Sequence, residues 1–141
     1  MSSTHRVHFF HLIWSTKRRQ NFILPKIQDK LYPYIGGIIR KSDGNLLEIG
    51  GIANHIHLLV EISNLTNYIT LIRNSKASST TFLKKEFPEC QIFAWQDGYG
   101  SFTVNISLLD KVRDYIKNQE YHHRSQTFEQ EYIKFLSLIH I

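Results

Sequence analysis

The sequence has few of the residues that cross-link or interrupt a fold. It contains one cysteine, Cys90, and three prolines among 141 residues. A single cysteine excludes an internal disulfide framework and a zinc site made of cysteines alone, and it fits a reducing compartment. No apolar run approaches the roughly 18 residues that span a membrane, and residues 1–20 lack the apolar segment of a signal peptide. We therefore expect a cytoplasmic protein without a membrane partner.

What is present is typical of one folded domain. Hydrophobic residues make up 42% of the chain and aromatic residues 13%, which excludes a disordered or low-complexity protein. No internal repeat or linker appears, so we expect a single domain over residues 1–141. The net charge of +5 fits a nucleic-acid-binding surface, although many small proteins are as basic. The basic residues expected to contact nucleic acid are Lys17, Arg18, Arg19 and Arg124.

The hydrophobic pattern predicts an α+β fold. Strands are expected over residues 6–15, 46–52, 55–62, 91–96 and 101–106. Helices are expected over residues 25–41, 66–86, 107–123 and 128–139. Pro33 is expected to kink or split the first helix, and a break is expected near residues 75–80 of the second. This order predicts an antiparallel sheet with helices packed on it, close to a ferredoxin or RRM-like layout.

Two histidines stand next to each other on one predicted strand. The even positions of residues 55–62 are all apolar, whereas His55 and His57 share the opposite face. Their Cα atoms are expected about 6.5–7 Å apart, so the two imidazoles can converge on one divalent metal ion. The alternative is a pair of ordinary half-exposed histidines on a sheet.

The helix predicted over residues 107–123 carries a second polar group. Tyr115 and Gln119 are four residues apart, so they lie one above the other on the helix surface. Asn118 and His122 continue the same polar stripe, and we expect them to support the site. The alternative is a tyrosine at the edge of the core with a hydrogen-bonded hydroxyl, beside an exposed glutamine.

Together these two segments suggest chemistry on a phosphate. The imidazoles of His55 and His57 and the carboxamide oxygen of Gln119 would form an uncharged site that binds a hard cation weakly until a phosphate completes it. The metal would polarise a phosphate oxygen. Tyr115 would be the nucleophile, because a phenol with a pKa of about 10 ionises more readily than an aliphatic hydroxyl. A phosphotyrosine link would then conserve the bond energy for rejoining a strand.

Four motifs along the chain resemble those of one family. They are the sequences LIWST at residues 12–16, NHIHLLV at 54–60, WQDGYG at 95–100, and YIKNQ at 115–119, the last followed by two histidines. In this order they resemble the single-tyrosine HUH transposases of small bacterial insertion sequences, which include the IS200-like and REP-associated tyrosine transposases. HUH denotes two histidines that flank a hydrophobic residue. Many relatives carry aspartate at the position of Asn54, a difference that would lower metal affinity if that carboxylate tunes the metal.

This resemblance implies an HUH nuclease fold and a DNA transposase activity. It implies that His55, His57 and Gln119 bind Mg²⁺ or Mn²⁺. It also implies that Tyr115 attacks single-stranded DNA and leaves a 5′-phosphotyrosine and a free 3′-hydroxyl. Family members are homodimers that bind DNA hairpins at element ends, and the tyrosine helix of one subunit can serve the histidines of the other.

Two other functions remain open at this point. A domesticated relative would use the same residues to cut repeated chromosomal hairpins without moving its own gene, and flanking hairpin ends in the gene context would distinguish the two. A non-catalytic, RRM-like binder would instead stack the bases of single-stranded DNA or RNA on Phe9, Phe10 and Trp14. Metal-independent binding without cleavage would favour that binder.

Overall fold

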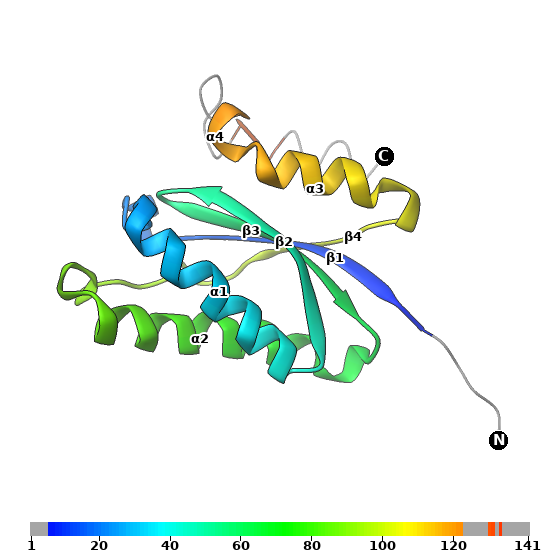
Figure 1. The fold of residues 1–141 in the computed structure, drawn as a ribbon, viewed down its shortest axis with the longest axis horizontal. Coiled ribbons are helices and arrows are strands. Elements are labelled where there is room, and N and C mark those ends of the chain that lie inside the picture. The colour runs from blue at the N-terminus through cyan, green and yellow to red at the C-terminus, as the bar shows by residue number, and fades with distance from the viewer. Residues whose placement is uncertain (1–5, 123–129, 132, 134–141) are drawn as a thin grey trace.

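The fold is built on one antiparallel sheet with helices on both faces (Figure 1). The computed structural model describes residues 6–122 together with Gln130, Glu131 and Ile133. The four strands are β1 (His8–Ser15), β2 (Gly44–Ile52), β3 (His55–Ile62) and β4 (Gly100–Thr103). Their order in the sheet is β2-β3-β1-β4, and every neighbouring pair is antiparallel. This arrangement confirms the predicted α+β class and places β1 in the interior of the sheet.

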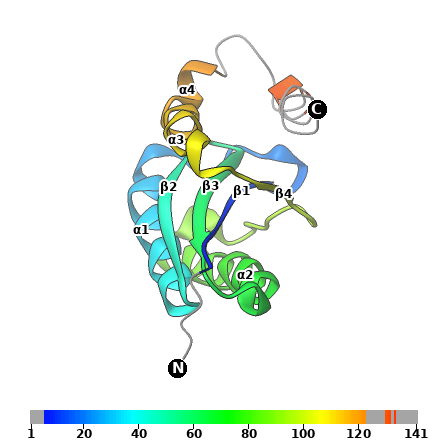
Figure 2. The same cartoon turned by 90° about the vertical axis from the view of Figure 1, so that its right-hand side faces the viewer.

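The helices form two layers. Helices α1 (Pro25–Lys41) and α2 (Tyr68–Glu86) lie on one face of the sheet, and α3 (Leu109–Lys117) and α4 (Gln119–His122) lie on the other (Figure 1, Figure 2). Short 3-10 turns connect these elements: η1 (Lys17–Arg19), η2 (Leu65–Asn67), η3 (Pro88–Cys90) and η4 (Ile106–Leu108). None of the described helices is both long and apolar enough to cross a membrane.

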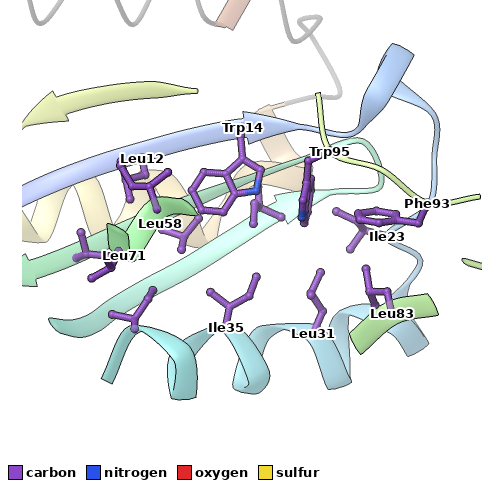
Figure 3. Close-up of a cluster of buried hydrophobic side chains, with 14 of the residues drawn as sticks. Leu12, Trp14, Ile23, Leu31, Ile35, Leu58, Leu71, Leu83, Phe93 and Trp95 are labelled. Carbon is purple, nitrogen blue, oxygen red and sulfur yellow. The ribbon is translucent and has the colours of Figure 1, made fainter. Parts of the chain in front are cut away.

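The larger core lies between the sheet and the layer of α1 and α2. Leu12, Trp14 and Leu58 point into it from β1 and β3 (Figure 3). Residues four apart share one face of a helix, so α1 contributes a buried side chain at every turn. The buried residues of α1 are Ile27, Leu31, Ile35 and Ile39. This core stabilises the two central strands that carry the histidines.

A smaller core joins α3 to the opposite face of the sheet. Leu59 of β3 packs there with Val104 and with Ile116 of α3. Gly50 of β2 allows the close approach, because a Cβ at this position would overlap the carbonyl oxygen of Ile116. The helix that carries Tyr115 is thereby held directly against the sheet.

Two predicted breaks are absent. Helix α1 continues through Pro33, which lies on the exposed side where water can bond the carbonyl that proline leaves without a donor. Helix α2 continues through residues 75–80. There the hydroxyls of Ser75 and Thr80 donate to the carbonyls of Leu71 and Lys76, at 2.8 and 2.9 Å, and remain compatible with the helix.

Three predicted elements differ from the structure. Residues 91–96 form no strand, although Phe93 and Trp95 are buried in the larger core. Trp95 makes only an isolated bridge, to Thr16, just after the end of β1. The strand predicted over residues 101–106 is the shorter β4. The helix predicted over residues 107–123 is divided, because Asn118 leaves helical geometry, with φ −101° and ψ 28°, between α3 and α4. The helix predicted over 128–139 falls largely outside the described residues.

Candidate active site

His55 and His57 lie on the sheet face that α3 covers. Both side chains are fully buried, with 0% of their surface exposed, and their ring centroids are 5.1 Å apart. Leu59, two residues further along the strand, packs against Ile116 of α3. The histidines therefore share a covered face and are not the half-exposed pair that the sequence left as an alternative.

Side chains from two other segments converge on the two imidazoles. The Nε2 atom of His55 lies 3.3 Å from Oε1 of Gln119 and 3.4 Å from Oε1 of Glu131. The Nε2 atom of His57 lies 2.9 Å from the same Glu131 oxygen. Ligands about 2.1 Å from an octahedral Mg²⁺ ion are about 3.0 Å apart, so these spacings and donor types fit a divalent cation.

Glu131 is the member of this cluster that the sequence did not indicate. It lies twelve positions after Gln119, and its side chain is only 1% exposed. Together with the two histidines it forms a group with ligand atoms within 4.8 Å of one another. An acidic residue on an amphipathic helix ordinarily faces solvent, so no local signal distinguishes it. Its carboxylate gives the site a negative charge, whereas the sequence predicted an uncharged one.

Hydrogen bonds to the far nitrogens orient both imidazoles. The Nδ1 atom of His55 lies 2.8 Å from Oδ1 of Asn54, and Nδ1 of His57 lies 2.8 Å from Nε2 of His11. The Asn54 oxygen can only accept, so it holds the proton on Nδ1 of His55 and leaves Nε2 for the cluster. Asn54 thus meets this requirement with a neutral oxygen in place of a carboxylate.

The histidines also control the charge of the acidic side chain. Burial would raise the pKa of Glu131, but the contacts with His55 and His57 hold it well below the usual range of a carboxyl group. His11 is buried as well, and its burial together with the neighbouring His57 lowers its pKa. We therefore describe Glu131 as a carboxylate and His11 as a neutral imidazole at pH 7.

Tyr115 reaches the same cluster from α3. Its ring lies beside His57 and His11, with centroid distances of 5.8 and 6.4 Å. Its hydroxyl hydrogen-bonds with Glu131 and Gln119. Burial, followed by the contact with Glu131, raises the pKa of this phenol. The Nε2 of Gln119 donates to the Tyr115 carbonyl at 3.3 Å, so the two residues stay stacked although the helix divides between them.

The other residues predicted for the site lie elsewhere or outside the description. Asn118 is exposed, and its Nδ2 donates to the carbonyl of Asp114 at 2.8 Å, so it does not join the cluster. His122 ends α4, and its side chain is outside the described residues, as is Arg124. The basic residues 17–19 are exposed in η1, immediately after the end of β1.

The aromatic residues expected of an RRM-like binder do not form an open platform. Phe10 stacks on Tyr68 with ring centroids 4.1 Å apart, and Trp14 is 2% exposed in the larger core. Phe9 packs on the smaller core. Base stacking on β1 would require these contacts to open.

Comparisons with known proteins agree with one another. The family model described as "Transposase IS200 like" matches residues 4–119. The transposase for insertion sequence element IS200 of Salmonella typhimurium strain LT2 is 29% identical over 120 residues, which cover 78% of this chain and 75% of that protein. The corresponding transposase of Salmonella typhi matches equally.

Two solved structures share the fold. A candidate transposase from Deinococcus radiodurans R1 superimposes with a TM-score of 0.66 at 21% identity, covering 84% of this chain and 98% of the other. A REP-associated tyrosine transposase bound to a REP hairpin superimposes with a TM-score of 0.56 at 14% identity, covering 87% and 74%. At these identities the likeness establishes the architecture.

Proposed function

This chain belongs to the IS200-like transposase family, and from that membership we propose that it is a metal-dependent endonuclease and strand transferase for single-stranded DNA. The observation that carries the proposal is the convergence of a tyrosine hydroxyl with two imidazoles and a carboxamide oxygen. We assign Tyr115 as the nucleophile, and His55, His57 and Gln119, with Glu131 beside them, as the side chains that hold the metal. The family accounts for the reaction class, and the cluster supports the assignment of residues.

In the proposed reaction, the Tyr115 oxygen attacks a phosphorus atom of the DNA strand. A bond forms from this oxygen to phosphorus, and the bond from phosphorus to the neighbouring 3′ oxygen breaks. The phenolic proton leaves Tyr115 and a proton ends on the 3′ oxygen, so the products are a 5′-phosphotyrosine and a free 3′-hydroxyl. Attack by a second 3′-hydroxyl reverses these steps and joins two strands.

The surroundings of Tyr115 explain why a cation is needed. Burial, followed by the neighbouring Glu131 carboxylate, raises the pKa of Tyr115 and holds the phenol in its protonated form. A Mg²⁺ or Mn²⁺ ion at this site would polarise a phosphate oxygen and offset the carboxylate charge that retains the phenolic proton. His11 and Asn54 keep the ligand nitrogens turned toward the cluster throughout.

We propose that the substrate is a DNA hairpin with a single-stranded flank. The fold is shared with a transposase bound to a REP hairpin, and the basic turn η1 leaves β1 next to Ser15, which pairs with His55. A homodimer would supply one site and one tyrosine for each end of an element. Within one chain, the contacts of Tyr115 with His57 support assembly of each site from a single subunit.

The experiment is a covalent trapping assay. The full chain is incubated with a hairpin oligonucleotide carrying single-stranded flanks, with Mn²⁺ or with EDTA, and the products are separated by denaturing gel electrophoresis. A protein–DNA adduct is expected only with Mn²⁺, and Tyr115→Phe should abolish it while hairpin binding survives. An adduct of equal yield from Tyr115→Phe would disprove the assignment of the nucleophile.

A further inference from the structure

A small cavity lies next to the proposed reaction centre, between β1, η1 and the loop that enters β4. It is open to solvent and has a volume of about 190 Å³. Ile13 and Ser15 line it, and they pair with His57 and His55 across β1 and β3. The Cα atoms of paired residues in antiparallel strands are about 4.5–5.5 Å apart. A group bound in the cavity would therefore lie beside a phosphate held at the histidines.

The outer wall of the cavity is a loop held in place by hydrogen bonds to α2 and to β1. The ammonium of Lys76 donates to the carbonyls of Gln96 and Gly98, both at 2.8 Å. The Gln96 N–H donates to the Ser15 carbonyl at 2.8 Å, and the indole of Trp95 donates to Ser79 at 2.9 Å. Gly98 adopts a φ of +86°, which few other residues tolerate. These contacts position the loop, and they account for Trp95 and Gly98 of the WQDGYG motif.

The side chains on this wall suit a flat heterocycle. The Tyr99 ring is 42% exposed, and an exposed aromatic ring stacks on any nucleobase. Gln96 is exposed and lines the cavity, and its Oε1 accepts the Arg18 backbone N–H at 3.3 Å. Arg19 and Asp97 complete the wall with a guanidinium and a carboxylate, both of which bond base edges. At this volume the cavity is smaller than an ordinary drug-sized site, so it suits one base and not a pair.

We propose that this cavity binds one unpaired nucleobase of the DNA strand, the base adjacent to the phosphate that is cleaved. The inference rests on the proposed function, which supplies the strand, and it adds a subsite where the protein itself reads one position of the flank. Stacking on Tyr99 would supply affinity and hold the base in the cavity. Arg19, Gln96 and Asp97 would read the edge of the base only while it is held there, and so supply the preference for one base.

The test uses the full chain with Tyr115→Phe, which allows binding without cleavage. A hairpin library with six randomised nucleotides in its single-stranded flank is bound, recovered and sequenced. Tyr99→Leu is compared with Tyr99→Phe, which keeps the ring. Arg19→Ala is compared with Arg73→Ala, an exposed arginine of α2 that does not line the cavity, because both variants lose one positive charge.

We expect the parent protein to select a base at one flank position. Tyr99→Leu should abolish that preference and weaken binding of the selected hairpin about 5- to 150-fold, the loss expected for one stacked base, and Tyr99→Phe should retain both. Arg19→Ala should reduce the preference, and Arg73→Ala should leave it intact. A flank without any preference, a preference that survives Tyr99→Leu, or equal effects of Arg19→Ala and Arg73→Ala would each overturn the proposal.

The two hypotheses fail in different ways. A hairpin that forms the Mn²⁺-dependent adduct with Tyr115 present but shows no base preference overturns the nucleobase subsite alone. A preference that depends on Tyr99 without any adduct supports the subsite and overturns the strand-transfer reaction.

Discussion

His11 on β1 and His57 on β3 form a buried imidazole pair, with Nε2 of His11 2.8 Å from Nδ1 of His57. Both side chains have no exposed surface. When His11 accepts the Nδ1 proton of His57, the Nε2 lone pair of His57 points to the cluster, as a metal ligand requires. His11 is therefore a positioning residue that acts through His57.

Replacing His11 should weaken metal binding without removing a ligand. We expect His11→Phe to lower Mn²⁺ affinity about 10- to 100-fold, the usual cost of losing such a partner, measured by isothermal titration calorimetry. His8→Phe is the matched control, because His8 lies on the same strand outside the cluster and is only half-buried. Unchanged Mn²⁺ affinity in a folded His11→Phe protein would contradict the positioning role.

Glu131 should contribute to metal binding through its charge. Glu131→Gln keeps the shape of the side chain but removes the anion closest to both Nε2 atoms, so we expect Mn²⁺ affinity to fall about tenfold or more, a loss at least comparable to that of an orienting partner. Glu120→Gln, at an exposed position of α4, removes one charge away from the cluster. Equal affinities of the two variants would show that Glu131 does not contact the ion.

The raised pKa of Tyr115 predicts a loss of stability in alkali. A phenol whose pKa is higher in the folded state stabilises that state fully below the unfolded pKa of about 10, and this contribution is lost as the pH rises above that value. Tyr115→Phe should therefore lose less stability than the parent between about pH 9 and pH 11, measured by thermal unfolding. Tyr99→Phe, at an exposed site, should behave like the parent; identical pH profiles for the parent and Tyr115→Phe would contradict this environment.

Replacement by alanine should have opposite effects on stability at two glycines, Gly50 of β2 and Gly37 of α1. Gly50→Ala places a methyl group against the Ile116 carbonyl, so it should lower the free energy of unfolding by about 1–3 kcal/mol and reduce adduct yield by displacing Tyr115. At Gly37 of α1 a Cβ meets no atom within 4 Å, so Gly37→Ala should raise stability by up to about 1 kcal/mol. Urea unfolding measures both, and a neutral Gly50→Ala would contradict the close packing.

The basic turn η1 should contribute to DNA binding by charge. Replacing Lys17 and Arg18 together by alanine should reduce the slope of log affinity against log salt by about 1.4–1.8, as expected for two phosphate contacts. Replacing Lys84 and Lys85, at the end of α2, removes the same charge on the other face. Fluorescence anisotropy with a labelled hairpin measures both slopes, and equal changes would assign the effect to net charge.

The sequence alone determined the features that depend on local periodicity. Alternation over residues 55–62 and helical spacing over residues 25–41 predicted elements whose bounds agree closely with β3 and α1, because each pattern reports one face that must be buried. The same logic failed at residues 91–96. Phe93 and Trp95 of this segment are buried in the core, and burial alone does not say whether a segment also pairs as a strand.

Only the tertiary structure decided what surrounds the two histidines. His11 lies 46 residues from His57, Gln119 lies 64 from His55, and Glu131 lies 74 from His57. Such contacts depend on strand order and on where α3 packs, and no local pattern encodes either. The sequence therefore identified the reactive groups, the imidazoles of His55 and His57 and the phenol of Tyr115. The fold then buried the two histidines, oriented His57 through His11, and added a carboxylate that changes the charge of the site.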